Sequence, residues 1–201
     1  MHEKCGVVGV KDLRGERDVV PWTAEIAYNL KHRGQLGAGI AVIRADAQQA
    51  LWVIKDNGPV EMVLSPEKLQ HCASTAAIAH TRYATSGSRD ACLAQPFVDE
   101  GIAYAFNGNI ANHASVEASQ RDRGVTLCTD VDTELLGNEI VGGIRRHSRR
   151  NMGAVFRDLE NVLDGSFNVV VLGEEGDLYA YRNALGNRPM AYAVIDDRYV
   201  V

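Results

Sequence analysis

The C-terminal third of the sequence is a succession of short apolar segments separated by turns, and this pattern limits the folds that the chain can adopt. Segments 167–172, 178–181 and 190–194 are rich in aliphatic and aromatic residues, and the turn-forming run 174–177 separates the first two. Runs of this length and composition are typical of strands. Because strands that follow one another through short turns pair antiparallel, this region predicts an antiparallel sheet.

The rest of the sequence adds more strands and several helices. Pro21 marks a helix start, and Trp22, Ile26 and Leu30 follow at four-residue spacing before Gly34 ends the pattern. Further predicted elements are strands over 6–10, 40–43, 51–54, 76–79 and 102–106, a short helix over 66–69, and two helices with one apolar face, from about Asp132 and over 152–163. Together these elements predict an α+β fold in which helices cover antiparallel sheets.

Length and charge narrow the class of protein. The 201 residues are 46% hydrophobic, which allows one domain with a real core. A net charge of -5 and a pI near 5.7 give no broad basic surface, so we expect neither nucleic acid nor a membrane as a partner. The basic run 145–150 is typical of a solvated helix end. No apolar run approaches the ~20 residues of a membrane span, and no signal peptide is evident, so the expected location is the cytoplasm.

The four cysteines do not suggest a metal centre. Cys5, Cys72, Cys92 and Cys128 form no C-x-x-C pair. His71-Cys72 and His80 could in principle join Cys92 in a zinc site, but dispersed His and Cys residues are more often structural. Reduced, dispersed thiols fit a cytoplasmic protein. We therefore expect neither a bound metal nor another cofactor.

Cys5 is the residue whose side chain is most suited to act as a nucleophile. It stands at the head of the first predicted strand, four residues from the start of the sequence. If residues 1–4 were removed as a propeptide, its own α-amino group, with a pKa of roughly 7.7–8.0, could accept the thiol proton at neutral pH. Nucleophile and base would then belong to one residue. The alternative from this segment alone is a buried core cysteine, a frequent environment for this residue type.

Polar motifs follow several predicted strands and helices. A glycine-containing loop occupies 32–39, the run 80–87 follows the strand at 76–79, and 107–109 follows the strand at 102–106. Loops at the ends of rigid strands are where functional sites are commonly built. Each motif also has a simpler explanation: Arg82 in a surface ion pair, Asp132 as a helix N-cap, and Asn107-Gly108 as a hairpin turn.

Taken in order, these motifs resemble those of class II glutamine amidotransferases with the N-terminal nucleophile fold, and among them the glutaminase domain of amidophosphoribosyltransferases. The residues that carry the resemblance are Cys5-Gly6-Val7-Val8-Gly9, His32-Arg33-Gly34-Gln35, His80-Thr81-Arg82-Tyr83-Ala84-Thr85, Gln95-Pro96-Phe97, Asn107-Gly108-Asn109, Asp132-Thr133-Glu134 and Arg188-Pro189. The resemblance implies a four-layer αββα sandwich of two antiparallel sheets. It also implies a propeptide at 1–4 and a glutaminase domain at 5–201.

The same resemblance implies a role for each site residue. Cys5 would be the nucleophile, and Asn107 and Gly108 would form the oxyanion hole. Arg82 would bind the α-carboxylate of glutamine, and Asp132 would bind its α-ammonium group. Arg33 and Gly34 would shape the loop over the substrate, and Tyr83 would also belong to the substrate-binding residues. A guanidinium fork suits a carboxylate, and rigid N–H donors suit an oxyanion. Glutamine would be hydrolysed through a Cys5 thioester to glutamate and ammonia.

The resemblance implies that the ammonia passes to an acceptor. The sequence has no acidic pair followed by a Gly/Thr-rich phosphate loop, so we expect the synthase domain or subunit that accepts ammonia to lie outside this chain, as for the phosphoribosyltransferase half of amidophosphoribosyltransferase. Two other functions stay open at this point. One is a non-catalytic, glutamine-binding regulatory module, and the other is an N-terminal-nucleophile acylase that acts on another amide.

Overall fold

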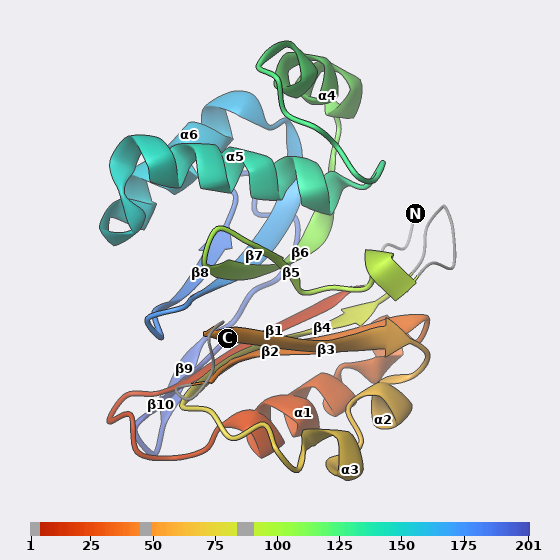
Figure 1. The fold of residues 1–201 in the computed structure, drawn as a ribbon, viewed down its shortest axis with the longest axis vertical. Coiled ribbons are helices and arrows are strands. Elements are labelled where there is room, and N and C mark those ends of the chain that lie inside the picture. The colour runs from red at the N-terminus through yellow and green to blue at the C-terminus, as the bar shows by residue number, and fades with distance from the viewer. Residues whose placement is uncertain (1–4, 45–49, 84–90) are drawn as a thin grey trace.

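A computed structural model describes residues 5–44, 50–83 and 91–201 of the chain. The proposed propeptide at 1–4 and the end of the motif that begins at His80 lie outside these described residues. The described chain forms four layers, with helices outside two stacked sheets (Figure 1). This arrangement confirms the predicted α+β class and the αββα sandwich.

The first sheet has six strands within the described residues, and each neighbouring pair is antiparallel. Its spatial order is β3 (Leu51–Asn57), β2 (Gly37–Ile43), β4 (Ala76–Arg82), β1 (Gly6–Asp12), β10 (Arg198–Val200) and β9 (Ala193–Ile195). All seven residues of β4 are buried, because this central strand is covered on both faces.

The second sheet has four antiparallel strands within the described residues. Its spatial order is β5 (Phe97–Asp99), β6 (Ile102–Ile110), β7 (Gly165–Gly173) and β8 (Leu178–Arg182). The prediction of an antiparallel hairpin at 167–181 is therefore confirmed. The expected strand over 190–194 is shifted, because strand geometry begins only at β9 and β9 pairs with β10 in the first sheet.

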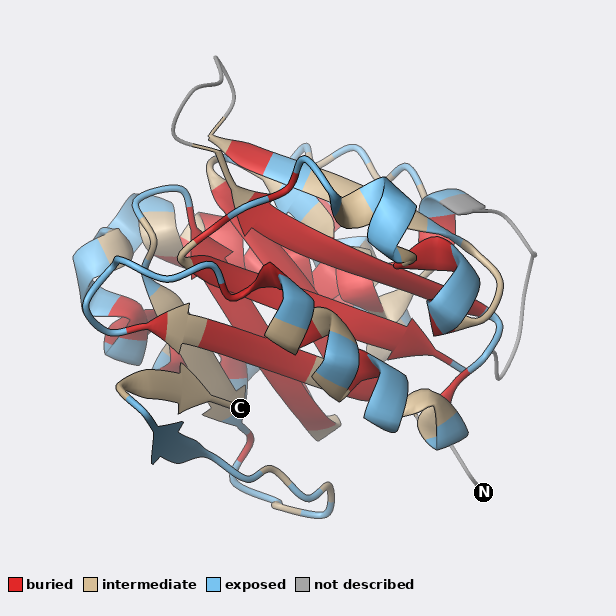
Figure 2. Ribbon diagram, turned by 90° about the horizontal axis from the view of Figure 1, so that it is seen from below, coloured by how far each residue is buried: buried red, intermediate tan, exposed pale blue. Residues whose placement is uncertain are grey.

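Helices cover the outer face of each sheet (Figure 1). The helices over the first sheet are α1 (Val20–Asn29), α2 (Val60–Val63) and α3 (Pro66–Leu69). The helices over the second sheet are α4 (His113–Asp122), α5 (Asp132–His147) and α6 (Met152–Val162). Three short 3₁₀ turns are η1 (Lys31–Arg33), η2 (Ala91–Leu93) and η3 (Arg149–Asn151). Figure 2 shows exposed residues on the outward sides of the helices and buried residues along the strands behind them. The helix α4 was not predicted, because only Val116 and Gln120 of its residues are buried.

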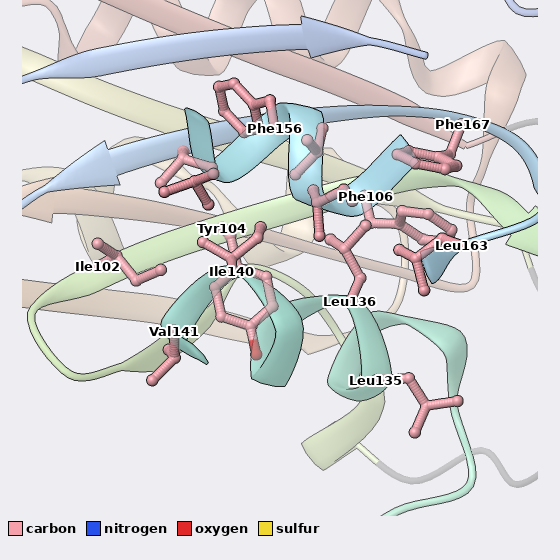
Figure 3. Close-up of a cluster of buried hydrophobic side chains, with 14 of the residues drawn as sticks. Ile102, Tyr104, Phe106, Leu135, Leu136, Ile140, Val141, Phe156, Leu163 and Phe167 are labelled. Atoms are coloured by element: carbon pink, nitrogen blue, oxygen red, sulfur yellow. The ribbon is translucent and has the colours of Figure 1, made fainter. Parts of the chain in front are cut away.

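Three apolar clusters hold the layers together. One lies between α1–α3 and the first sheet, a second between the two sheets, and the third between the second sheet and α5–α6. In the third cluster, Leu136 and Ile140 of α5 lie beside Tyr104 and Phe106 of β6 (Figure 3). Burial of each such side chain contributes on the order of 1.5–3 kcal/mol to folding. These packed layers hold the strand ends in fixed positions.

Two of the predicted strands, those at 76–79 and 102–106, extend into segments that were expected to be loops of the site. The strand expected to stop at Ala79 continues to Arg82, since Gly6 of β1 pairs with Thr81 and Gly37 of β2 pairs with Arg82. The strand expected to stop at 106 continues to Ile110 along β7. Asn107 and Gly108 therefore lie within a ladder, and neither the predicted strand end nor the alternative hairpin turn exists there.

Candidate active site

Cys5 lies immediately before β1, and its side chain is partly buried. The Gly6 N–H donates to Thr81 Oγ1 over 3.1 Å, so the ladder with β4 begins one residue after the cysteine. The Cys5 thiol lies 3.8 Å from the backbone carbonyl of Tyr83. The pairing of β1 with β4 thus holds the Cys5 sulfur near the end of β4.

Arg33 lies beside Cys5, and Gly34 lies against the end of β4. Arg33 ends η1, and its Nε donates to the Cys5 carbonyl over 2.8 Å. Gly34 packs so closely on the backbone of Arg82 and Tyr83 that a Cβ atom there would collide with it. A residue with a side chain at position 34 would push the loop off the end of β4.

Arg82 is the last residue of β4 and is only 9% exposed. Its backbone carbonyl accepts from Leu36 N–H, which ties the 34–36 loop to the strand end. Within the described part of the chain, no carboxylate forms an ion pair with Arg82, so the alternative of a surface ion pair is not observed. A buried cation of this kind is most stable with an anionic ligand. Tyr83, which follows it, is exposed.

Asn107 faces the first sheet from β6, and it shares a cavity of about 470 Å³ with Cys5 and Arg33. The other walls of this cavity are mainly apolar residues from α1, the segment 189–193 and β10. Asn107 Oδ1 accepts from Arg188 Nη1 at 3.5 Å. Gly108 lies opposite Phe167 in the ladder, and a Cβ atom at Gly108 would collide with Phe167.

Asp132 is the first residue of α5, and its carboxylate contacts a strand and a second helix. Its Oδ2 accepts from Ile110 N–H over 2.8 Å, and its Oδ1 lies 2.6 Å from His113 Nδ1. The N-cap position belongs to Val131, so the alternative of a capping aspartate is not observed. The Asp132 carboxylate is therefore fixed beside the C-terminal end of β6.

The structure brings the sequence-predicted site residues to one end of the two sheets. Cys5, Arg33 and Asn107 line one cavity, and Gly34, Arg82 and Tyr83 are joined to Cys5 through short contacts. Gly108 follows Asn107 on β6, and Asp132 binds the same strand two residues further on. Gly34, Arg82, Tyr83, Gly108 and Asp132 do not line the 470 Å³ cavity itself.

Sequence reasoning missed Asn168 as a member of this cavity. Asn168 pairs with Asn107 across β6 and β7 and is 1% exposed. Its Nδ2 donates to the Pro189 carbonyl over 2.9 Å, whereas its Oδ1 has no hydrogen-bond partner among the described residues. Alternation along the strand 167–172 was the available signal, because it places residue 168 on the opposite face from Phe167 and Val169.

His80 lies on β4 two residues before Arg82 and is completely buried. Burial lowers its pKa to about 3, and the nearby Phe106 backbone offsets only part of this effect. Neither ring nitrogen meets hydrogen-bond geometry with a described residue. The imidazole is therefore neutral at physiological pH and adds no positive charge beside Arg82.

The described residues contain no group of three or more His, Cys, Asp or Glu side chains that could hold a metal ion. They also contain no helix with the length and apolar character needed to cross a membrane.

One solved structure with this architecture is titled as a glutamine phosphoribosylpyrophosphate (PRPP) amidotransferase. The B. subtilis glutamine PRPP amidotransferase superimposes with a TM-score of 0.79 and 26% identity, covering 96% of this chain and 40% of that chain. A second structure, titled as the allosteric regulatory enzyme of purine biosynthesis, gives 0.82 with the same identity and coverage. The class defined by this fold is the N-terminal nucleophile fold of those amidotransferases.

Sequence comparison then gives the family. Residues 80–201 match the family model described as a glutamine amidotransferase domain. The amidophosphoribosyltransferase of Mycobacterium tuberculosis is 35% identical over 207 residues, and that of Archaeoglobus fulgidus is 32% identical over 202 residues. The chain therefore belongs to the glutamine amidotransferase domain family.

The chain spans less than half the length of these relatives. The two alignments cover 100% and 98% of this chain, but only 38% and 42% of the respective relatives. The match is thus to one part of a larger enzyme in each case.

Proposed function

We propose that this domain hydrolyses glutamine to glutamate and ammonia, with Cys5 as the nucleophile. The observation that carries the proposal is the shared cavity of Cys5, Arg33 and Asn107, together with the buried Arg82 at the end of β4, which forms no ion pair with a carboxylate of the described residues. A thiol, an amide donor and a carboxylate-binding cation are the groups needed for attack on an amide that also bears an α-carboxylate. Family membership supports glutamine as that amide.

The reaction proceeds in two steps. The Cys5 thiol gives its proton to the α-amine of the same residue, and Sγ attacks the side-chain carbonyl carbon of glutamine. Asn107 Nδ2 and the Gly108 N–H stabilise the oxyanion, a contribution of roughly 3–4 kcal/mol per donor. The C–N bond breaks, ammonia leaves with the returned proton, and water hydrolyses the γ-glutamyl thioester to glutamate and free thiol.

The amino-acid end of glutamine is held by two charges. Arg82 pairs with the α-carboxylate, for which its planar guanidinium offers two parallel donors. Asp132 pairs with the α-ammonium, and Ile110 N–H and His113 hold its carboxylate in place. Arg33 lines the Cys5 cavity, and Gly34 and Tyr83 lie outside it at the end of β4. This pair of charges selects a free amino acid over other amides.

Processing at the N-terminus is part of the proposal. While residues 1–4 remain attached, the Cys5 nitrogen is a peptide amide and cannot act as a base. Removal of Met1 alone would expose His2, so the required cleavage lies between Lys4 and Cys5. The unprocessed chain is then an inactive precursor.

The ammonia acceptor is proposed to be a separate domain or subunit, as in amidophosphoribosyltransferase. Tyr192, Val194 and Ile195 are exposed apolar residues next to the Cys5 cavity, and Tyr192 and Ile195 line it. Exposed apolar side chains around a cavity are typical of an interaction surface. This placement supports an acceptor that covers the cavity and receives uncharged ammonia from it.

The experiment is ammonia release from glutamine by protein whose N-terminus is Cys5. Cys5→Ala should lose activity, and Cys5→Ser should be severely impaired, because an alcohol is a weaker nucleophile here than a thiolate. Cys72→Ser is the matched control, since Cys72 is a buried cysteine that does not line the cavity. Undiminished ammonia release by Cys5→Ala would overturn the proposal.

A further inference from the structure

Gln95 occupies an unusual place in the second sheet. The β5–β6 register pairs Phe97 with Tyr104, so its continuation places Gln95 opposite Phe106. Strand β5 begins only at Phe97, and Pro96 has no N–H with which to extend the ladder. The main chain of Gln95 therefore lies outside the strand pairing, at the point where β6 approaches Asn107.

The Gln95 side chain takes over the missing ladder contact. Its Oε1 accepts from the Phe106 N–H over 2.6 Å, so a side-chain carbonyl stands where a neighbouring strand would supply a backbone carbonyl. Its Nε2 donates to Thr133 Oγ1 over 2.9 Å. Gln95 is 7% exposed and Thr133 is 5% exposed, so both hydrogen bonds are shielded from water.

Gln95 thus forms a hydrogen-bonded bridge between Phe106 and Thr133. Each end of this bridge adjoins a proposed substrate-binding residue. Phe106 directly precedes Asn107, the proposed oxyanion donor, on β6. Thr133 directly follows Asp132, the proposed ammonium ligand, on α5. Asn107 and Asp132 therefore lie in different layers of the fold, one in a sheet and the other in a helix. The buried Gln95 side chain connects the β6 backbone next to Asn107 with the first turn of α5 next to Asp132.

We propose that Gln95 is a positioning residue that fixes the spacing between the oxyanion donor and the ammonium ligand. The proposal rests on the glutaminase function proposed above. Glutamine is held at both ends, so the distance between those ends must match the length of the substrate. An amide side chain can accept from a backbone N–H through its oxygen and donate to a hydroxyl through its nitrogen at the same time.

The first test separates the two ends of the bridge. Thr133→Val removes the bond to α5 but keeps the bond between Gln95 and Phe106. The readout is the ratio of kcat/KM for glutamine to that for 4-carbamoylbutanoate, which is glutamine without its α-amino group. We expect this preference to fall about tenfold, as for one lost hydrogen bond that supports a charged group. The kcat for glutamine should stay near wild type, and Thr133→Ser should restore the preference.

The second test removes the bridge. Gln95→Met keeps the volume of the side chain but neither accepts from Phe106 nor donates to Thr133. We expect kcat for glutamine to fall about a hundredfold, the effect of a misplaced catalytic group, and the preference for the α-amino group to fall as well. Gln70→Met is the matched control, because Gln70 is an exposed glutamine beside α3. It should leave both quantities unchanged.

The outcomes separate this inference from the proposed function. A processed wild-type protein that does not hydrolyse glutamine would overturn both. Wild-type hydrolysis together with an unchanged preference in Thr133→Val would overturn the positioning role alone. An equal loss of activity toward both substrates in Thr133→Val, without rescue by Thr133→Ser, would assign these residues a structural role only and would also overturn the inference.

Discussion

Arg33 Nε donates to the backbone carbonyl of Cys5 over 2.8 Å, although the two residues are 28 positions apart in the sequence. The pairing of β1 with β4 begins only at Gly6, so this bond fixes the peptide of Cys5 itself. Arg33 also lines the same cavity as Cys5. The guanidinium therefore acts on both the position of the nucleophile and the wall of the site.

This relationship predicts a large effect of a conservative change. Arg33→Lys keeps the positive charge but removes the Nε donor and the planar fork. We expect kcat/KM for glutamine to fall about tenfold or more, the scale of one lost hydrogen bond from a charged group. Lys31→Met, in the same short helix η1, removes an ammonium that donates to Tyr28 and does not line the cavity, so this variant should keep wild-type activity in the same ammonia-release assay. Equal activity of the two variants would contradict the assigned role of Arg33.

His113 is expected to support glutamine binding through Asp132. Its Nδ1 lies 2.6 Å from Asp132 Oδ1, and removal of the ring would leave Ile110 N–H as the remaining contact that orients the carboxylate. We expect His113→Ala to raise KM for glutamine about tenfold with little change in kcat. His147→Ala, which removes a histidine paired with Asp158 at the other end of α5, is the control. A normal KM in His113→Ala would show that Asp132 needs no second partner.

His80 should make the stability of the protein depend on pH. Its folded-state pKa is about 3, below the unfolded value near 6.5, so the unfolded chain binds the proton first as pH falls. The stabilisation is complete above about pH 6.5 and is lost as pH falls toward 3. We expect the His80 contribution to the free energy of unfolding to drop by about 2 kcal/mol between pH 7 and pH 5.

Urea denaturation of wild type and His80→Leu at these two pH values measures this contribution. The variant should lose the pH-dependent part, because leucine does not titrate. A wild-type protein with the same pH dependence as the variant would show that the pKa of His80 does not differ between the folded and unfolded states, contrary to the expectation.

Replacement of two adjacent glycines of α5 by alanine should change the stability of the protein in opposite directions. A Cβ atom at Gly142 would meet only the flexible end of Arg146, so Gly142→Ala should stabilise the helix by about 1 kcal/mol. A Cβ atom at Gly143 would lie 2.8 Å from Val155 Cγ1 of α6, so Gly143→Ala should destabilise the protein by about 1–3 kcal/mol. Thermal unfolding of both variants tests the packing of α5 on α6, and equal shifts would contradict it.

Much of the fold could be predicted because its signals are local. The helices α1, α5 and α6 appear where four-residue apolar spacing predicted them, and β7 and β8 form the expected hairpin. The buried face of α1 differs in detail: Val20, Thr23 and Ala27 are buried, whereas Trp22, Ile26 and Leu30 pack at its flank. Periodicity identifies a helix, but the shape of the surface beneath it decides which stripe faces inward.

The site was predictable as a set of residues, but not as a geometry. The ordered motifs identified Cys5, Arg82, Asn107 and Asp132 as candidates, and the structure places them at one end of the two sheets. Asn168 escaped detection, because nothing in a run of apolar strand residues shows which pocket an inward-facing amide will enter. Its place depends on the pairing of two strands that lie some sixty residues apart.

The sequence by itself determined the kinds of elements, the α+β class and the chemistry available at Cys5, because periodicity, turn composition and side-chain type are properties of short segments. Tertiary structure alone decided where β4 and β6 end, since their last residues pair with partners as distant as Gly6 and Gly165. It also decided that β9 and β10 join the first sheet and that Gln95 bridges Phe106 to Thr133. Backbone pairing and the burial of polar groups depend on segments that meet only after folding, and no local pattern specifies such meetings.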